Sequence, residues 1–151
     1  MEKRTIYIGA DAAGFRLKGE IIAHLQEGGY DVTDCGTYSD ASCHYPEFAA
    51  AVCRRVQAEP QTSFGILVCG TGIGMSMAAN KHKGIRAAVC GDTFSARFTR
   101  LHNDANVLCL GARVTGTGLA LDIVDQFLQN GFEGGRHALR VDMITEIERQ
   151  Q

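Results

Sequence analysis

The chain has 151 residues, of which 45% are hydrophobic and 21% are charged, and these values are ordinary for one globular domain. Its formal net charge of −2 gives no reason to expect nucleic acid or an anionic membrane surface as a partner. No apolar run reaches the ~18 residues that a membrane span needs, and no signal-peptide pattern precedes the first apolar run. The sequence therefore predicts a cytoplasmic protein without a membrane segment.

Apolar runs alternate along the chain with longer amphipathic stretches. In chain order they predict a strand at 5–9, a helix at 15–27, a strand at 30–35, a helix from 46 to about 56, a strand at 64–69, a helix at 75–83, a strand at 85–90, a helix at 93–101, a strand at 107–111, a helix at 118–130 and a last helix from about 136 to the end.

This alternation indicates an α/β fold in which a parallel sheet is covered on both faces. We expect a single Rossmann-like, doubly wound domain over residues 1–151, with about five parallel strands and a C-terminal helix. Ligands of such sheets bind beyond the carboxyl ends of the strands, so the segments that follow the strands are the candidate site.

The six cysteines show no CxxC spacing, and four of them stand inside apolar runs. Together with the missing signal peptide, this favours reduced thiols over disulfides and argues against a zinc site. Cys69 differs from the other five because it ends a strand and precedes a glycine-rich turn. A thiol among backbone donors at a helix start is expected to ionise more readily, and its thiolate could remove a proton from carbon. The alternative is a small buried hydrophobic residue.

The turn after Cys69 has the sequence Gly70-Thr71-Gly72-Ile73-Gly74. Glycines let backbone N–H groups approach a ligand closely, and the helix that follows adds unpaired donors, so the turn is a candidate anion site. The G-x-G-x-G spacing argues against a dinucleotide site, and so does the next predicted strand, 85–90, because no acidic residue closes it. The alternative is a tight turn that needs glycine only for its shape.

A second cluster, His102-Asn103-Asp104, lies between a predicted helix and a predicted strand. We place it on the same ligand edge of the sheet, where His102 could move protons near neutral pH. The alternative is a turn histidine beside a helix-capping Asn103.

Three arginines and one carboxylate complete the candidates. Arg136 and Arg140 share one face of the last helix with Met143 and Ile147, and this placement predicts that both arginines point inward to an anion such as a phosphate. Internal salt bridges are the alternative. Arg113 follows the fifth strand. Asp11 follows the first strand and could bind a sugar hydroxyl or cap the next helix.

These residues together resemble the family of ribose-5-phosphate isomerase B, which also includes the galactose-6-phosphate isomerase subunits. The similar segments cover nearly the whole chain: Asp11-Ala12-Ala13-Gly14-Phe15, Tyr45-Pro46, Cys69-Gly70-Thr71-Gly72-Ile73-Gly74, Ala78-Ala79-Asn80-Lys81, Gly84-Ile85-Arg86-Ala87, His102-Asn103-Asp104-Ala105-Asn106, Gly111-Ala112-Arg113 and Gly134-Gly135-Arg136-His137.

The resemblance implies an aldose–ketose isomerase of sugar phosphates that uses no metal and no organic cofactor. It implies a homodimer or higher assembly with active sites at the subunit interface, to which the C-terminal arginines reach from a neighbouring subunit. Its implied catalytic residues are Cys69 as the base, His102 for opening the furanose ring, and Thr71. Its implied substrate-binding residues are Asp11, Ala12, Gly70, Gly72, Ile73, Gly74, Asn103, Arg113, Arg136 and Arg140.

The chain departs from the family pattern at Ala12, where ribose-5-phosphate isomerases usually have histidine. In this respect it is more similar to one subunit type of galactose-6-phosphate isomerase. Two alternatives to a ribose 5-phosphate substrate therefore stay open: a hexose 6-phosphate such as allose or galactose 6-phosphate, and a phosphosugar-binding subunit without activity of its own. The retained Cys69 and His102 argue against the second.

Overall fold

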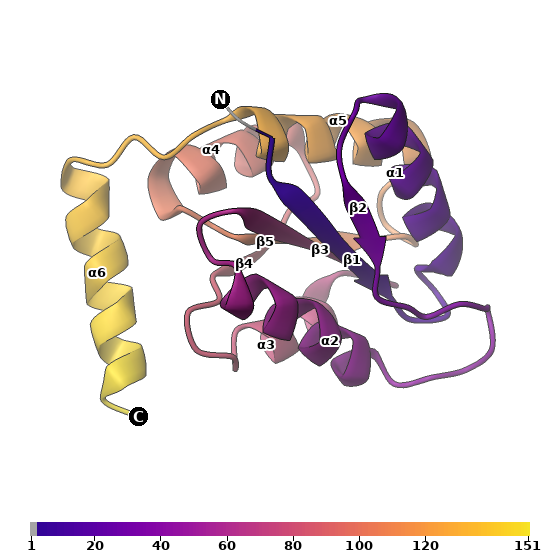
Figure 1. The fold of residues 1–151 in the computed structure, drawn as a ribbon, viewed down its shortest axis with the longest axis horizontal. Coiled ribbons are helices and arrows are strands. Elements are labelled where there is room, and N and C mark those ends of the chain that lie inside the picture. The colour runs from indigo at the N-terminus through magenta and orange to yellow at the C-terminus, as the bar shows by residue number, and fades with distance from the viewer. Residues whose placement is uncertain (1–2) are drawn as a thin grey trace.

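The computed structural model of the protein describes residues 3–151 (Figure 1). Its strands are β1 (Thr5–Ala10), β2 (Val32–Asp34), β3 (Ser63–Cys69), β4 (Ala87–Val89) and β5 (Val107–Gly111). Its helices are α1 (Phe15–Glu27), α2 (Tyr45–Ala58), α3 (Ile73–Ala79), α4 (Thr93–Asn103), α5 (Thr117–Gln129) and α6 (Arg136–Arg149). Within the described residues no helix is long and apolar enough to cross a membrane.

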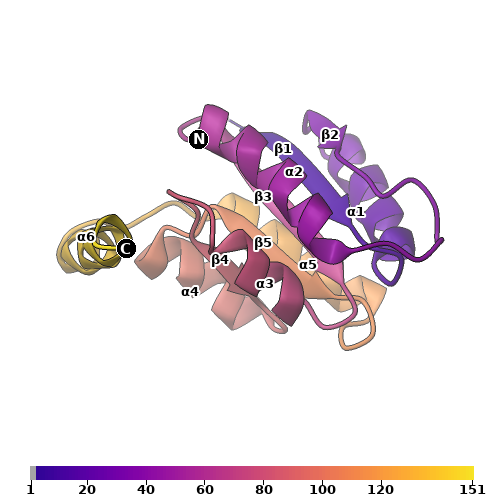
Figure 2. The same cartoon turned by 90° about the horizontal axis from the view of Figure 1, so that it is seen from below.

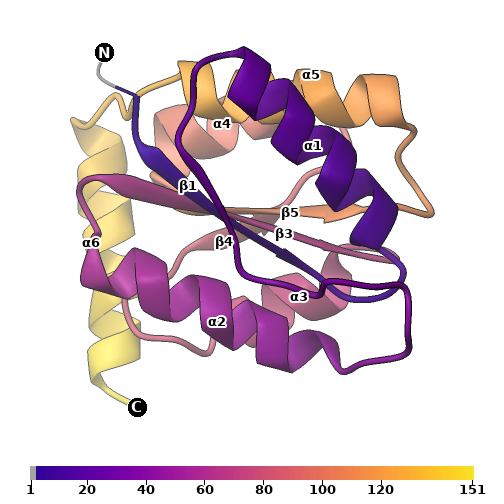
Figure 3. The same cartoon turned by 45° about the vertical axis from the view of Figure 1, so that its right-hand side comes forward.

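All five strands pair in parallel in the order β2-β1-β3-β5-β4, which confirms the predicted α/β class. Helices α1, α4 and α5 cover one face of the sheet, and α2 and α3 cover the other (Figure 3). The central strand β3 is buried along its whole length, because it has strands on both sides and helices on both faces. Its continuous apolar sequence is the signal that predicted it.

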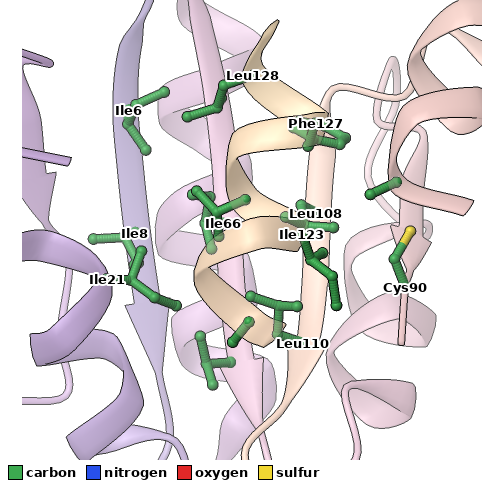
Figure 4. Close-up of a cluster of buried hydrophobic side chains, with 14 of the residues drawn as sticks. Ile6, Ile8, Ile21, Ile66, Cys90, Leu108, Leu110, Ile123, Phe127 and Leu128 are labelled. Carbon is green, nitrogen blue, oxygen red and sulfur yellow. The ribbon is translucent and has the colours of Figure 1, made fainter. Parts of the chain in front are cut away.

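The larger core lies between the sheet and α1 and α5 (Figure 4). Ile66 of β3 and Leu108 of β5 face Ile123 and Phe127 of α5, and all four side chains are fully buried. Burial of side chains of this size stabilises the fold by about 1.5–3 kcal/mol each. The sheet is therefore a rigid platform on which the loops at its edges are positioned.

The two edge strands are shorter than the sequence predicts, since β2 and β4 have three residues each. Each of them pairs with one neighbour only, β2 with β1 and β4 with β5. Helix α3 is also shorter than predicted and ends at Ala79, and α4 extends two residues further than predicted, to Asn103.

Helix α6 lies beside the main body and does not cover the sheet (Figures 1 and 2). Near its start, the buried His137 ring stacks on His102 of α4, and near its end Glu148 accepts a hydrogen bond from the Gly84 N–H at 2.8 Å. Between these two attachments is a groove of about 790 Å³, lined by α6, by the end of α4 and by residues 80–88. The helix thus touches its own chain along only one side.

Candidate active site

Three loops meet at the carboxyl edge of the sheet, one after each of β1, β3 and β5. From the adjacent strands β1 and β3 the chain turns to opposite faces, since α1 lies on one face and α3 on the other. Such a switch point leaves a crevice between neighbouring loops, and open parallel sheets bind their ligands there. Asp11, Cys69 and Arg113, predicted separately from sequence, are brought to this edge.

The Cys69 side chain lies inside the loop that it opens. Its residue is 5% exposed, and its Sγ accepts a hydrogen bond from the Gly72 N–H at 3.1 Å. Gly72 has φ of +81°, and a Cβ there would lie 3.0 Å from the Leu110 carbonyl carbon, so only glycine suits this position. The loop is therefore shaped so that a backbone donor faces the sulfur, which is the interaction that a thiolate needs.

Two of the loop N–H groups are already used within the loop. The Gly72 N–H serves the thiol, and the Ile73 N–H donates to the Thr71 hydroxyl at 3.2 Å. The expectation that the whole turn offers its donors to a ligand is therefore modified by the structure. Thr71 itself is exposed at the edge, beside the sulfur.

Three other cysteines, Cys53, Cys90 and Cys109, are buried in the apolar core. Burial raises the pKa of the Cys53 thiol to about 12 and that of Cys90 to about 11, and it also raises the pKa of Cys109 well above its usual range. These thiols stay protonated near neutral pH and serve as small apolar core residues. All six cysteines are free thiols in the structure.

Asp11 and Arg113 lie on either side of the Cys69 loop. The Asp11 carboxylate accepts a hydrogen bond from the Gly14 N–H at 3.1 Å, which fixes the turn after β1. The N-cap of α1 is Gly14, so Asp11 is not the helix cap that the sequence left open. Arg113 is exposed, and a Cβ on Gly70 would lie only 3.4 Å from its guanidinium. One cation and one anion thus flank the thiol.

Tyr45 also belongs to this edge, although the sequence analysis assigned it no place in the site. Its ring packs on Gly74, where a Cβ would lie 2.8 Å from the ring. The start of α2 therefore closes one side of the Cys69 loop. The signal was the Tyr45-Pro46 pair, since proline at a first helical position fixes where the helix begins.

His102 and Asn103 are not at this edge, and the prediction that placed them there is wrong. They are the last residues of α4, directly before β5, and a helix that leads into a parallel strand delivers the chain to the amino end of the sheet. The five residues of β5 alone separate the two edges by roughly 16 Å. The side chain of His102 cannot cross that distance to the Cys69 of its own chain.

At the amino edge His102 belongs to a cluster of three titratable groups. Its ring stacks on that of His137 with a centroid distance of 3.9 Å and an interplanar angle of 10°. The Glu133 carboxylate faces both rings, with oxygens 3.8 Å from His102 Nε2 and 3.6 Å from His137 Nε2. The spacing of Glu133 and His137 by four residues was the available sequence signal, and it was missed.

These three side chains are the one grouping in residues 3–151 with the composition of a metal site. The parallel rings do not suit a metal. An ion midway between them would lie roughly half of their separation outside each ring plane, whereas a Zn–N bond of about 2.0–2.1 Å follows a lone pair in the plane. The arrangement fits proton sharing better.

Arg136 and Arg140 are exposed, which corrects the prediction that they point inward. They do share a face of α6 with Met143 and Ile147, as predicted, but these two are also 60% exposed. The face of α6 that packs on its own chain contains His137 and Val141 instead. Within residues 3–151 neither arginine forms a salt bridge, so the alternative of internal ion pairs is not seen.

Comparison with known proteins identifies the family. The sequence profile of the family described as Ribose/Galactose Isomerase matches residues 6–144. The chain is 50% identical over 148 residues to ribose-5-phosphate isomerase B of Escherichia coli K12, covering 98% of this chain and 99% of that protein. It is 47% identical over 147 residues to a probable ribose-5-phosphate isomerase B of Mycoplasma pneumoniae, covering 97% and 96%.

Solved structures agree with this result. Ribose-5-phosphate isomerase B of Clostridium thermocellum has 51% sequence identity and a TM-score of 0.94, with 97% of this chain and 98% of that chain covered. The enzyme of Mycoplasma genitalium, solved with bound ribulose-5-phosphate, has 41% identity and a TM-score of 0.95 over the full length of both chains. The profile match, the identity and the shared fold show that this chain belongs to the ribose/galactose isomerase family.

Proposed function

We propose that this protein is a sugar-phosphate isomerase that interconverts ribose 5-phosphate and ribulose 5-phosphate through an enediolate. The full-length similarity to ribose-5-phosphate isomerases B supports the substrate. The observation on which the chemistry depends is the Cys69 thiol at the carboxyl end of β3, with the Gly72 N–H directed at its sulfur. A base of this kind beside a carbonyl is what an aldose–ketose isomerisation requires.

In the proposed reaction the Cys69 thiolate removes the proton from C2 of the open-chain aldose. The electrons of the C2–H bond form the C1=C2 double bond, and negative charge develops on O1. Donors of the Cys69 loop, including the Thr71 hydroxyl, would stabilise that charge. The O2 proton passes to O1, and Cys69 returns its proton to C1 to give the ketose. Hydrogen moves within the substrate, so the step balances without metal or organic cofactor.

We further propose that the site is completed by a second copy of the chain, in a homodimer or a higher assembly. His102 and Asn103 lie about a strand length from the Cys69 of their own chain. Arg136 and Arg140 belong to α6, whose start packs beside His102. The exposed face of α6 combines those arginines with apolar side chains, which is the composition of a helix that packs against a partner.

In such an assembly the phosphate of the sugar would meet Arg113 of one copy and Arg136 and Arg140 of the other. Planar guanidinium groups bind phosphate with two parallel hydrogen bonds, which suits all three. His102 would open the furanose ring and Asn103 would bind the substrate. Asp11 would hold a sugar hydroxyl with the carboxylate oxygen that Gly14 does not use. We place the enzyme in the cytoplasm, where its six free thiols stay reduced.

The substrate is tested with a panel of aldose phosphates given to the purified protein alone. We expect turnover of ribose 5-phosphate. Preference for allose or galactose 6-phosphate would instead favour the hexose alternative, which Ala12 supports because a short side chain beside Asp11 leaves room for a longer sugar. No turnover of any aldose phosphate would contradict the proposal and leave the non-catalytic subunit.

The shared site is tested with two inactive variants, Cys69→Ala and His102→Gln, which are mixed and allowed to exchange subunits. If each site uses Cys69 of one copy and His102 of the other, half of the dimers are hybrids with one intact site, and activity returns to about one quarter of wild type. Variants that stay inactive together, although native mass spectrometry shows hybrids, would contradict the shared site.

A further inference from the structure

We infer that Glu133 is a positioning residue for His102. Its carboxylate shares one proton with His102 and His137, so that His102 can protonate the ring oxygen of the sugar. The inference rests on the proposed function, in which His102 opens the furanose ring. The sequence analysis and the family comparison assign no role to Glu133 or His137. The geometry of the three side chains points to one.

The carboxylate of Glu133 faces the imidazole rings of both His102 and His137. Its backbone N–H donates to the Leu101 carbonyl at 3.0 Å, which fixes the segment before α6 against the end of α4. Its two oxygens then stand 3.8 Å and 3.6 Å from the Nε2 atoms of His102 and His137, one oxygen to each ring. These are ion-pair distances, longer than a hydrogen bond, and contacts between catalytic groups often shorten when the substrate binds.

The His102 ring contacts two other rings. The His137 ring stacks on it with a centroid distance of 3.9 Å, and the Phe98 ring lies at 68° to it with a centroid distance of 4.9 Å. His137 is itself buried at the start of α6. A side chain held by stacking keeps the direction of its nitrogen atoms, and a proton donor needs that direction to be constant.

Electrostatic repulsion disfavours a second proton on the pair of rings. Two cationic rings in contact would repel each other, and Arg136 and Arg140 add positive charge nearby. Burial, the largest cause, together with His102, Arg136 and Arg140 lowers the pKa of His137, whereas Glu133 raises it. Glu133 is the negative group that faces the pair, and its charge can compensate one cationic ring.

The proton step is then balanced. As the C1–O4 bond of the furanose breaks, its electron pair goes to O4, which takes the proton of His102. The anomeric hydroxyl releases its proton to water and becomes the C1 carbonyl, and His102 regains a proton from water. Glu133 touches no substrate atom. It holds the imidazole in place and compensates its charge before the transfer.

The test separates ring opening from proton abstraction. Ribulose 5-phosphate has no furanose form, so exchange of its C1 proton with deuterium oxide needs Cys69 but no ring chemistry. In Glu133→Gln, which keeps the side-chain shape and removes the charge, we expect net conversion of ribose 5-phosphate to fall about 10-fold or more. Deuterium uptake at C1 of ribulose 5-phosphate, followed by proton NMR, should stay within about twofold of wild type.

Three further variants control the experiment. His102→Gln should show the same split, and the double variant Glu133→Gln/His102→Gln should lose little more than His102→Gln alone, because the two residues act as one unit. Glu27→Gln removes the same charge at an exposed position of α1 and should leave both rates unchanged. Cys69→Ala should lose both.

Two results would overturn the inference. Equal loss of net conversion and of exchange in Glu133→Gln would show a purely structural role, and wild-type rates in both assays would show none. A wild-type protein that converts no ribose 5-phosphate would instead contradict the proposed function, so the two failures are distinguishable. Since the Glu133 side chain is half exposed, its replacement is not expected to prevent folding, which a circular dichroism spectrum checks.

Discussion

The candidate residues are divided between the two edges of the sheet, with a buried thiol at one edge and exposed arginines at the other. At the carboxyl edge Cys69 is 5% exposed, and its sulfur, its donor and its glycine turn are fixed by the packing of the loop on β5. At the amino edge Arg136 and Arg140 are exposed on a helix that touches its own chain along one side. The first half is complete within one chain, whereas the second is presented outward.

This contrast shows that candidate site residues can be buried in one part of a chain and exposed in another. In the proposed reaction the loop at the carboxyl edge would need rigidity, because it would hold the base at a fixed angle. The proposed role of Arg136 and Arg140 would instead need exposure, and the outer face of α6 is exposed. Four experiments test this difference between the two edges.

The largest effect is expected for Cys69→Ala. Loss of the proposed base should lower the turnover of ribose 5-phosphate by about 10³-fold or more, while the sugar phosphate still binds. A coupled spectrophotometric assay and isothermal titration calorimetry measure the two quantities. Cys43→Ala, at a half-buried position in the loop before α2, should stay active. Unchanged turnover in Cys69→Ala would remove the thiol from the mechanism.

Removing one arginine of the outward half should weaken substrate binding. Arg136→Ala and Arg140→Ala each lose a charge-assisted contact of about 1.5–3 kcal/mol, which corresponds to a rise in KM of about 10- to 150-fold. Since neither side chain forms a salt bridge within residues 3–151, the melting temperature should not change. A fall in melting temperature with unchanged KM would reverse the assignment and make these arginines structural.

The carboxyl edge should be the edge at which replacing a glycine does the most damage. Gly72→Ala forces a side chain into the left-handed region and against Leu110, at a cost of about 1–2 kcal/mol in the free energy of unfolding. It should also lower turnover, because the Gly72 N–H would move away from the sulfur. Gly118→Ala, in an open position of α5, is the control and should be neutral or stabilising by about 0.4–1 kcal/mol.

The smallest effect concerns the pH dependence of stability at the amino edge. The pKa of His137 is lowered in the folded protein, so below its ordinary value of 6.5 the unfolded chain binds a proton that the folded chain does not. Stability should therefore decrease as the pH falls through about 6.5. His137→Asn should show a weaker decrease between pH 8 and pH 5 in thermal melts. An equal dependence of the melting temperature on pH in the wild type and in His137→Asn would contradict the assignment of this effect to His137.

The sequence was sufficient for the sheet and for the placement of Cys69 at its carboxyl edge. Continuous apolar runs predicted β3 and β5, and the position of Cys69 after such a run placed it at the carboxyl edge. These inferences depend on local periodicity and on a general property of parallel sheets, so they needed no knowledge of tertiary contacts.

The edge of His102 and the direction of Arg136 could not be obtained in the same way. The order helix-then-strand places His102 at the amino end, and the error came from applying the ligand-edge rule to a segment that precedes a strand. For Arg136 the pattern along α6 gives the face that the arginine shares, but periodicity does not say whether that face meets its own chain or another. Only the contacts of His137 and Val141 decide this.

The length of β5 has a consequence for how this enzyme behaves at low concentration. If a strand length separates the proposed base from the proposed ring-opening group, an isolated chain has no complete site even when it is perfectly folded. Catalysis per chain would then depend on dilution, and would disappear below the dissociation constant of the assembly while the fold persists. A folded but separated chain would thus be inactive, and its activity would return when a higher concentration restores the assembly.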